Sequence, residues 1–200
     1  MGGVLARYVD EFVDGIGAEL EALAGRDHRG DVTIEAGDLV AAVIDSDDRL
    51  TDDELEAWLD DIGPRLEPPV LVTSTRLREG GMLEGRRRWL EQPSTLFDLL
   101  VKADADRGGG RAVRYYDAAI RLAHAAAAVD LVPSPDEIAA IDRYRDVLLA
   151  AFDAAGVPRP GRPVAAETAE GARGAGVTPV GTTPGSTTQL PPVRPPKELV

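Results

Sequence analysis

The sequence predicts an all-α protein, a multi-helix bundle followed by a tail rich in proline, glycine and threonine. Apolar residues recur at spacings of three and four in successive segments up to residue 157, as in helices that bury one face. No segment makes a convincing strand. Because the composition changes abruptly after residue 157, we predict a helical domain at residues 1–157 and a disordered linker or tail at residues 158–200.

Three helices are predicted in the first half of the domain. The first covers residues 4–24, and a turn over 25–31 follows it. The second covers residues 33–45, with Ile34 expected on its inner face, and the third runs through residues 55–62 until Gly63 and Pro64 end it.

The second half begins with the least regular stretch, residues 65–92, in which a helical pattern is interrupted by glycines. Pro93 is expected in the first turn of the next helix, where its fixed φ and missing N–H fit. Residues 111–130 predict a strong helix whose inner face carries Val113, Tyr116, Ile120, Ala123 and Ala127. A last helix covers residues 135–155, and Gly156 and Pro158 end it.

The tail, residues 158–200, contains nine prolines, six glycines, six threonines and no aromatic residue. Such a composition buries too little apolar surface to offset the entropy of ordering the chain. We expect a linker, partly in the polyproline II conformation near residues 190–196.

Composition excludes several classes of function. There are no cysteines, so disulfides and zinc–thiolate sites are excluded, and two histidines are too few for most histidine-based sites. The net charge of −13, concentrated in residues 1–67 with 19 acids and 5 bases, argues against nucleic-acid binding. No signal peptide or membrane span is predicted, so a cytoplasmic protein is the default expectation.

Two segments of the domain match at an offset of 83 residues. Asp47 matches Asp130, Thr51 matches Ser134 and Glu54 matches Glu137, and Asp53 and Leu55 match Asp136 and Ile138. In each copy an apolar helix ends near an aspartate, a short loop follows, and a new amphipathic helix begins. The pattern indicates a degenerate internal duplication, although shared capping rules also produce such matches.

The residue pattern of both acidic loops fits the start of a capped helix better than it fits a calcium-binding loop. Thr51 and Glu54, like Ser134 and Glu137, have the spacing of a capping box. A twelve-residue calcium loop that started at Asp45 would place Arg49 where an oxygen ligand belongs and Leu50 where glycine is needed. A weaker divalent-metal site stays open as an alternative. Its candidate ligands are Asp45, Asp47, Glu54, Asp130 and Glu137.

A basic segment follows the acidic half. Arg86, Arg87 and Arg88 precede Trp89, and such a segment can bind an acidic partner with the tryptophan as an anchor. The alternative is a solvated helix face with Trp89 in the core. His124, in an alanine-rich helix, is expected to be packed or otherwise satisfied rather than to bind a ligand.

The two aspartates that stand seven residues before their glutamates carry a family resemblance. The segment AIRLAHAAAAVDLVPSPDEIAAI resembles the TerB-like helical family associated with tellurite resistance, over residues 33–62 and 111–155. The resemblance implies a TerB-like bundle in which the acidic loop between helices binds metal. The family pattern has glycine after the aspartate, where this chain has Asp48 and Leu131.

Residues 83–105 followed by 114–134 are also similar to the N-terminal region of actinobacterial AAA-type ATPases of the CbxX/CfxQ–SpoVK kind. In that family a proline-rich linker and an ATPase module follow, which would make residues 158–200 an interdomain linker. No P-loop motif occurs in this chain. We therefore expect a non-enzymatic adaptor that recruits proteins for such an ATPase, or alternatively a metal-binding stress-response protein.

Overall fold

The computed structural model describes residues 3–130 and 132–161, and its described part is helical without a strand. The longer helices are α1 (Val4–Ala24), α2 (Arg29–Ile44), α3 (Asp52–Asp61), α5 (Thr95–Arg107), α6 (Arg111–Ala127) and α7 (Pro135–Ala155). The shorter ones are η1 (Asp45–Asp47), η2 (Gly63–Arg65), α4 (Ser74–Glu79) and η3 (Arg86–Glu91). The predicted all-α class is thus confirmed. The predicted tail lies outside the described residues beyond residue 161.

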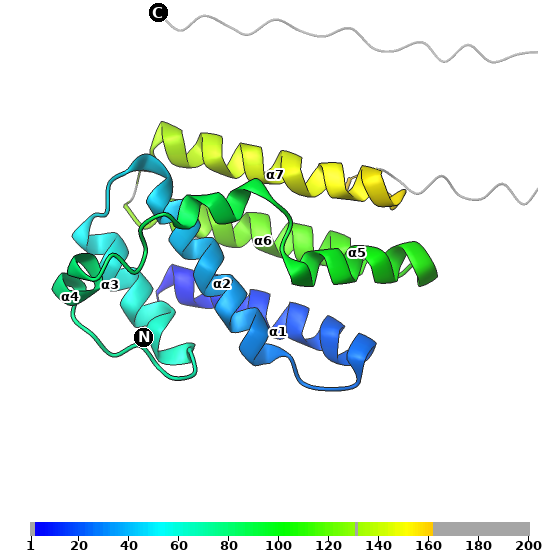
Figure 1. The fold of residues 1–200 in the computed structure, drawn as a ribbon, viewed down its shortest axis with the longest axis horizontal. Coiled ribbons are helices and arrows are strands. Elements are labelled where there is room, and N and C mark those ends of the chain that lie inside the picture. Colours follow the sequence, from blue (N-terminus) through cyan, green and yellow to red (C-terminus); the bar gives the residue numbers. More distant parts are fainter. Residues whose placement is uncertain (1–2, 131, 162–200) are drawn as a thin grey trace, which may run out of the picture. The chain divides into compact units, whose positions relative to one another are not determined.

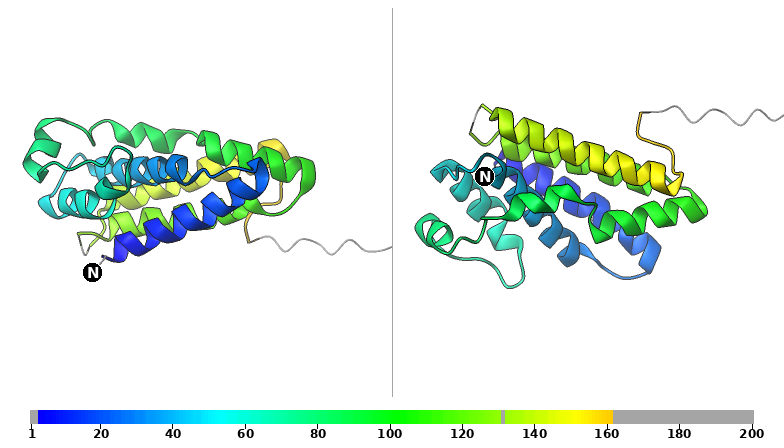
Figure 2. Two further views of the ribbon diagram at one scale, coloured as in Figure 1. Left: turned by 90° about the horizontal axis from the view of Figure 1, so that it is seen from below. Right: turned by 45° about the horizontal axis from the view of Figure 1, so that its top comes forward.

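The bundle is built around α2 and α6. Helix α6 packs against α1, α2, α5 and α7, and α2 packs against α1, α6 and η3. Figures 1 and 2 show α6 and α7 side by side, with α2 crossing the bundle obliquely and α3 and α4 at one end. None of the described helices is both long enough and apolar enough to span a membrane.

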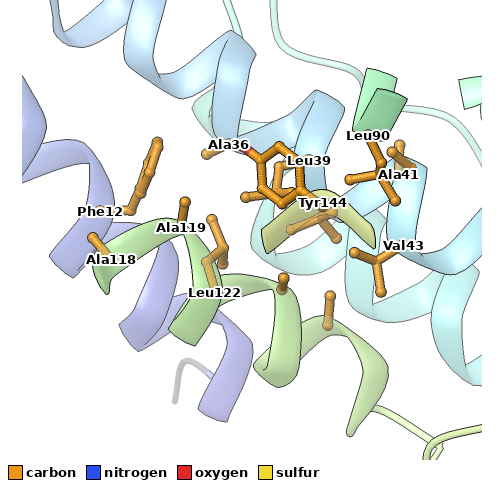
Figure 3. Packing of buried hydrophobic residues seen from close by; sticks show 14 of the residues in the cluster. Phe12, Ala36, Leu39, Ala41, Val43, Leu90, Ala118, Ala119, Leu122 and Tyr144 are labelled. Atoms are coloured by element: carbon orange, nitrogen blue, oxygen red, sulfur yellow. The ribbon is translucent and has the colours of Figure 1, made fainter. Parts of the chain in front are cut away.

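Alanines in α6 allow its neighbours to approach closely. Ala112, Ala119 and Ala126 are buried together with Tyr115. Ala123 and Ala127 are buried as predicted, whereas Val113, Tyr116 and Ile120 are only half-buried, so the prediction of the inner face is correct in the last turns of this helix only. Apolar neighbours in the core, including Phe12, Ala119, Leu122, Leu39 and Tyr144, are drawn in Figure 3.

Several boundaries differ from the prediction for local reasons. Helix α5 begins at Thr95 with Ser94 as its N-cap, so Pro93 precedes the cap and does not lie in the first turn. Helix α2 begins at Arg29, within the predicted turn. The irregular stretch contains α4, capped by Thr73, and a six-residue 3₁₀ helix, η3, that carries the three arginines. His124 is exposed, so of the two expected environments the packed one is wrong.

Candidate functional site

The two predicted capping boxes are present. Thr51 Oγ1 accepts from the Glu54 N–H at 3.2 Å, and Glu54 Oε2 accepts from the Thr51 N–H at 2.7 Å. Ser134 and Glu137 exchange the corresponding bonds at 3.1 and 2.7 Å. The offset of 83 extends to the helix boundaries. Helices α2 and α6 end at Ile44 and Ala127, and α3 and α7 begin at Asp52 and Pro135.

The backbone of the first acidic loop turns at Asp48. This residue has φ 59° and ψ 19°, in the left-handed region that glycine adopts readily and aspartate tolerates. Its position is the one at which the TerB-like pattern has glycine. Arg87 Nη1 donates to Asp48 Oδ1 at 2.6 Å, so an ion pair holds the side chain of this turn.

The two acidic loops meet in the fold. Thr51 Oγ1 is 2.9 Å from Asp130 Oδ1, so the hydroxyl that caps α3 also contacts the aspartate at the end of α6. Glu54 and Glu137 are each 3% exposed. Asp47, Glu54, Asp130 and Glu137 interact electrostatically, and we call these four residues the carboxylate quartet.

Burial and like charge shift the titration of the quartet's glutamates. Desolvation raises the pKa of Glu54 from its ordinary value of 4.5 to about 7, against the lowering effect of the Thr51 hydrogen bonds. The charges of Asp130 and Glu137 raise it further. Desolvation also raises the pKa of Glu137, and the charges of Asp47 and Asp130 add to this shift. At neutral pH the quartet therefore carries fewer than four negative charges.

The candidate metal ligands do not form a ready coordination shell. Among residues 3–130 and 132–161, no group of three or more acidic or histidine side chains is arranged to hold a metal ion. One oxygen of each quartet member already accepts a local hydrogen bond. Asp45, the fifth candidate, points away to η3, where its Oδ2 accepts from the Arg87 N–H at 3.0 Å. The site as folded does not fit a bound metal without a change in these bonds.

The basic segment is largely neutralised within the chain. Arg86 Nη1 lies 2.8 Å from Asp38 Oδ1, and Arg87 pairs with Asp48. Trp89 is half-buried with its ring centroid 5.6 Å from that of Tyr144. Arg88 is exposed, and no ion pair is found for it within the described part of the chain. The fold thus brings the predicted acidic and basic segments together.

A groove of about 410 Å³ lies between η3 and α7, and we call it the η3–α7 groove. Leu90, Ala140 and Val147 supply its apolar surface. Charged side chains line it as well, and the remaining lining residues are Ser46, Arg87, Glu91, Arg143 and Asp146. The groove thus includes one residue of the predicted partner-binding segment and begins beside the first acidic loop.

A buried polar network was not predicted. Glu35 is 8% exposed, and its Oε1 accepts from the Ser94 hydroxyl at 2.7 Å and from the Tyr115 hydroxyl. Burial raises the pKa of Glu35, while these hydrogen bonds oppose the shift. The Tyr144 hydroxyl lies beside that of Tyr115 but is buried without a hydrogen bond of normal geometry. The network joins α2, α5 and α6.

The signal for this network was present in the sequence. Glu35 lies three residues after Val32 and four before Leu39, both of which are buried, so it falls on the inner face of α2.

Comparison with known proteins adds no assignment: no protein-family description, curated protein or solved structure matches the chain.

Proposed function

We propose that the helical domain is a non-enzymatic interaction domain that binds a protein partner at the η3–α7 groove. The observation that supports this proposal is the groove itself, where the half-buried Val147 and the buried Leu90 and Ala140 form an apolar lining beside exposed charged side chains. Protein interfaces commonly combine an apolar centre with a polar rim. The groove also includes Arg87, from the segment in which partner binding was predicted.

Arg143 is the best-placed cation for a partner's acidic group. It lines the groove and is exposed, and within residues 3–130 and 132–161 no ion pair is found for it. Arg86 and Arg87, in contrast, already neutralise Asp38 and Asp48. Reversing the charge of Arg86 or Arg87 would therefore disturb the fold locally, whereas reversing Arg143 tests recognition with little structural cost.

The experiment compares proteins recovered by the full chain and by charge-reversal variants from extracts of its source organism. Arg143→Glu and Val147→Glu change the groove, and Arg121→Glu makes the same charge change at an exposed position on α6. A partner that uses the groove is lost with the first two variants and retained with the third. Binding is then repeated with the purified partner. Equal recovery with all three variants would contradict the proposal.

We further propose that this domain is the N-terminal region of an AAA-type ATPase, or a separate cytoplasmic partner of one. The sequence resemblance of residues 83–105 and 114–134 supports this. An immunoblot of the endogenous protein with an antibody against residues 1–157 tests it. A band far above 21.2 kDa supports a larger polypeptide, and a band at that mass removes that form of the proposal.

A second candidate function is divalent-metal binding by a TerB-like stress-response protein. The convergence of the carboxylate quartet supports it, although hydrogen bonds in the acidic loops must change before an ion can be held. Calorimetry and thermal unfolding with Ca²⁺, Mg²⁺ and Mn²⁺ should show binding by the wild type, loss in Asp47→Ala and no loss in Glu56→Gln. If wild type gives neither heat nor a stability change, this alternative is wrong.

A further inference from the structure

We propose that a second surface, along α2, docks a basic amphipathic helix of a protein partner. The surface comprises two hollows that share Ile34 as a lining residue, and we call it the α2 groove. It shares no lining residue with the η3–α7 groove, so the two binding proposals can be tested independently. Its lining residues on this side run from Asp27 to Ala41, a length of about 20 Å at 1.5 Å per residue.

One end of the α2 groove is apolar. The smaller hollow, about 130 Å³, is lined by Ile34, Trp58, Leu66, Val70 and Met82 among others. Ile34 is 52% exposed, so the prediction that it lies on the inner face of α2 was wrong, and Met82 is 39% exposed; both line the hollow together with buried side chains. Leu71, which follows Val70, is 78% exposed. Large apolar side chains gathered around a hollow indicate an interaction surface more than isolated ones do.

The groove favours a helical occupant. An extended peptide gains affinity by pairing its backbone with the edge of a sheet, and no strand is present in the described part of the chain. The backbone groups of α2 are bonded within the helix. A docking helix satisfies its own backbone groups, so only its side chains need partners. Its apolar face would meet Ile34 and Met82 in the manner of helix-in-groove complexes.

Charge favours a basic occupant. Three arginines line the α2 groove, and each already has a carboxylate partner: Arg29 with Asp14, Arg65 with Asp10 and Arg86 with Asp38. Glu67 is exposed at the polar end, and no ion pair is found for it among the described residues. Residues 1–67 carry 19 acids and 5 bases, so a second copy of this chain would meet a surface of the same sign. A basic partner would meet the opposite sign.

The test measures binding of the full chain to two labelled synthetic peptides of about 18 residues by fluorescence anisotropy at about 0.15 M salt. Both peptides have leucines at positions i, i+3, i+4 and i+7. The other positions are lysine in one peptide and glutamate in the other. The variants Ile34→Glu and Met82→Glu change the groove, and Leu99→Glu is the matched control at a 41% exposed position on α5. Circular dichroism checks that each variant is folded.

We expect the lysine peptide to bind the wild type and Leu99→Glu equally, and to bind Ile34→Glu and Met82→Glu at least about tenfold more weakly. Each of these variants adds a negative charge, so unspecific attraction would make them bind more tightly. Undiminished binding by both groove variants would overturn the proposal, as would equal loss in the control. Failure of the wild type to bind the lysine peptide at about 100 μM, or comparable binding of the glutamate peptide, would overturn it too.

Discussion

Replacing Glu54 with glutamine should stabilise the domain in alkaline solution and leave it unchanged in acid. Glutamine keeps an acceptor for the Thr51 N–H, so the capping box can persist, but it removes the charge that faces Asp130 and Glu137. The folded state holds the Glu54 proton more tightly than the unfolded state does, because the pKa rises from 4.5 to about 7 on folding. Wild-type stability therefore falls as pH rises through this window, and Glu54→Gln abolishes that loss.

The magnitude follows from the shift in pKa. A change from 4.5 to about 7 corresponds to an upper limit of about 3 kcal/mol in the free energy of unfolding. Burial is the larger cause of this shift, and because local relaxation reduces it and salt screens the smaller contribution of Asp130 and Glu137, the expected gain at pH 8 is about 1–2 kcal/mol. For a domain of this size, such a gain raises the Tm by roughly 3–6 °C. At pH 4, below the pKa of the unfolded state, Glu54 is largely protonated in both states, and the two proteins should agree.

Urea unfolding followed by circular dichroism at pH 4 and pH 8 measures both values. Glu56→Gln is the control, since it removes one carboxylate from the exposed face of the same helix. It should change stability little at either pH. If Glu54→Gln destabilises the domain equally at both values, Glu54 is ionised and favourably bonded when folded, and the account of the quartet as a site of repulsion is wrong.

Three further predictions, each tested by substitution, concern the packing and the polar contacts. Thr51→Val removes the cap of α3 and its contact with Asp130 and should cost about 1–2 kcal/mol by urea unfolding, whereas Thr51→Ser should cost less than half as much. Tyr144→Phe should leave stability unchanged or raise it by up to about 1 kcal/mol, while Tyr115→Phe, which deprives Glu35 of a donor, should cost about 1–3 kcal/mol in the same assay. Ala119→Leu should cost about 1–3 kcal/mol by overpacking the contact of α6 with α1 and α2, and a loss below about 0.5 kcal/mol in thermal unfolding would contradict this.

The helices were predictable where local rules act alone. Spacing located α1, and the cap residues Thr51 and Ser134 located the starts of α3 and α7, because the capping bonds lie within four residues. Three residues of α6 were wrongly predicted on its inner face because alanine is nearly neutral in an apolar count. Helix packing selects alanines where backbones must approach closely, and only the fold shows which positions these are.

The candidate site could be predicted only in part. The matched aspartates and glutamates were identified from their spacing, but their convergence depends on how α3, α6 and α7 pack. The pairing of Arg87 with Asp48 joins residues 39 positions apart, and nothing local to either segment indicates it. The two grooves arise from side chains of several elements, so single-sequence patterns could not locate them.

The hydroxyl of Ser94 forms two hydrogen bonds that connect the start of α5 to the buried polar network. It caps α5 by accepting from the Phe97 N–H at 3.0 Å, and it donates to the buried carboxylate of Glu35. Fraying of the first turn of α5 would therefore leave the buried Glu35 carboxyl group with one hydrogen-bond donor fewer. Ordinary helix ends open readily, but the N-terminus of α5 is hydrogen-bonded through Ser94 to a residue buried in the bundle. The amide hydrogen of Phe97, which is bonded to this hydroxyl, should consequently exchange with solvent only when much of the bundle opens, at a rate closer to that of α6 than to that of an ordinary helix end.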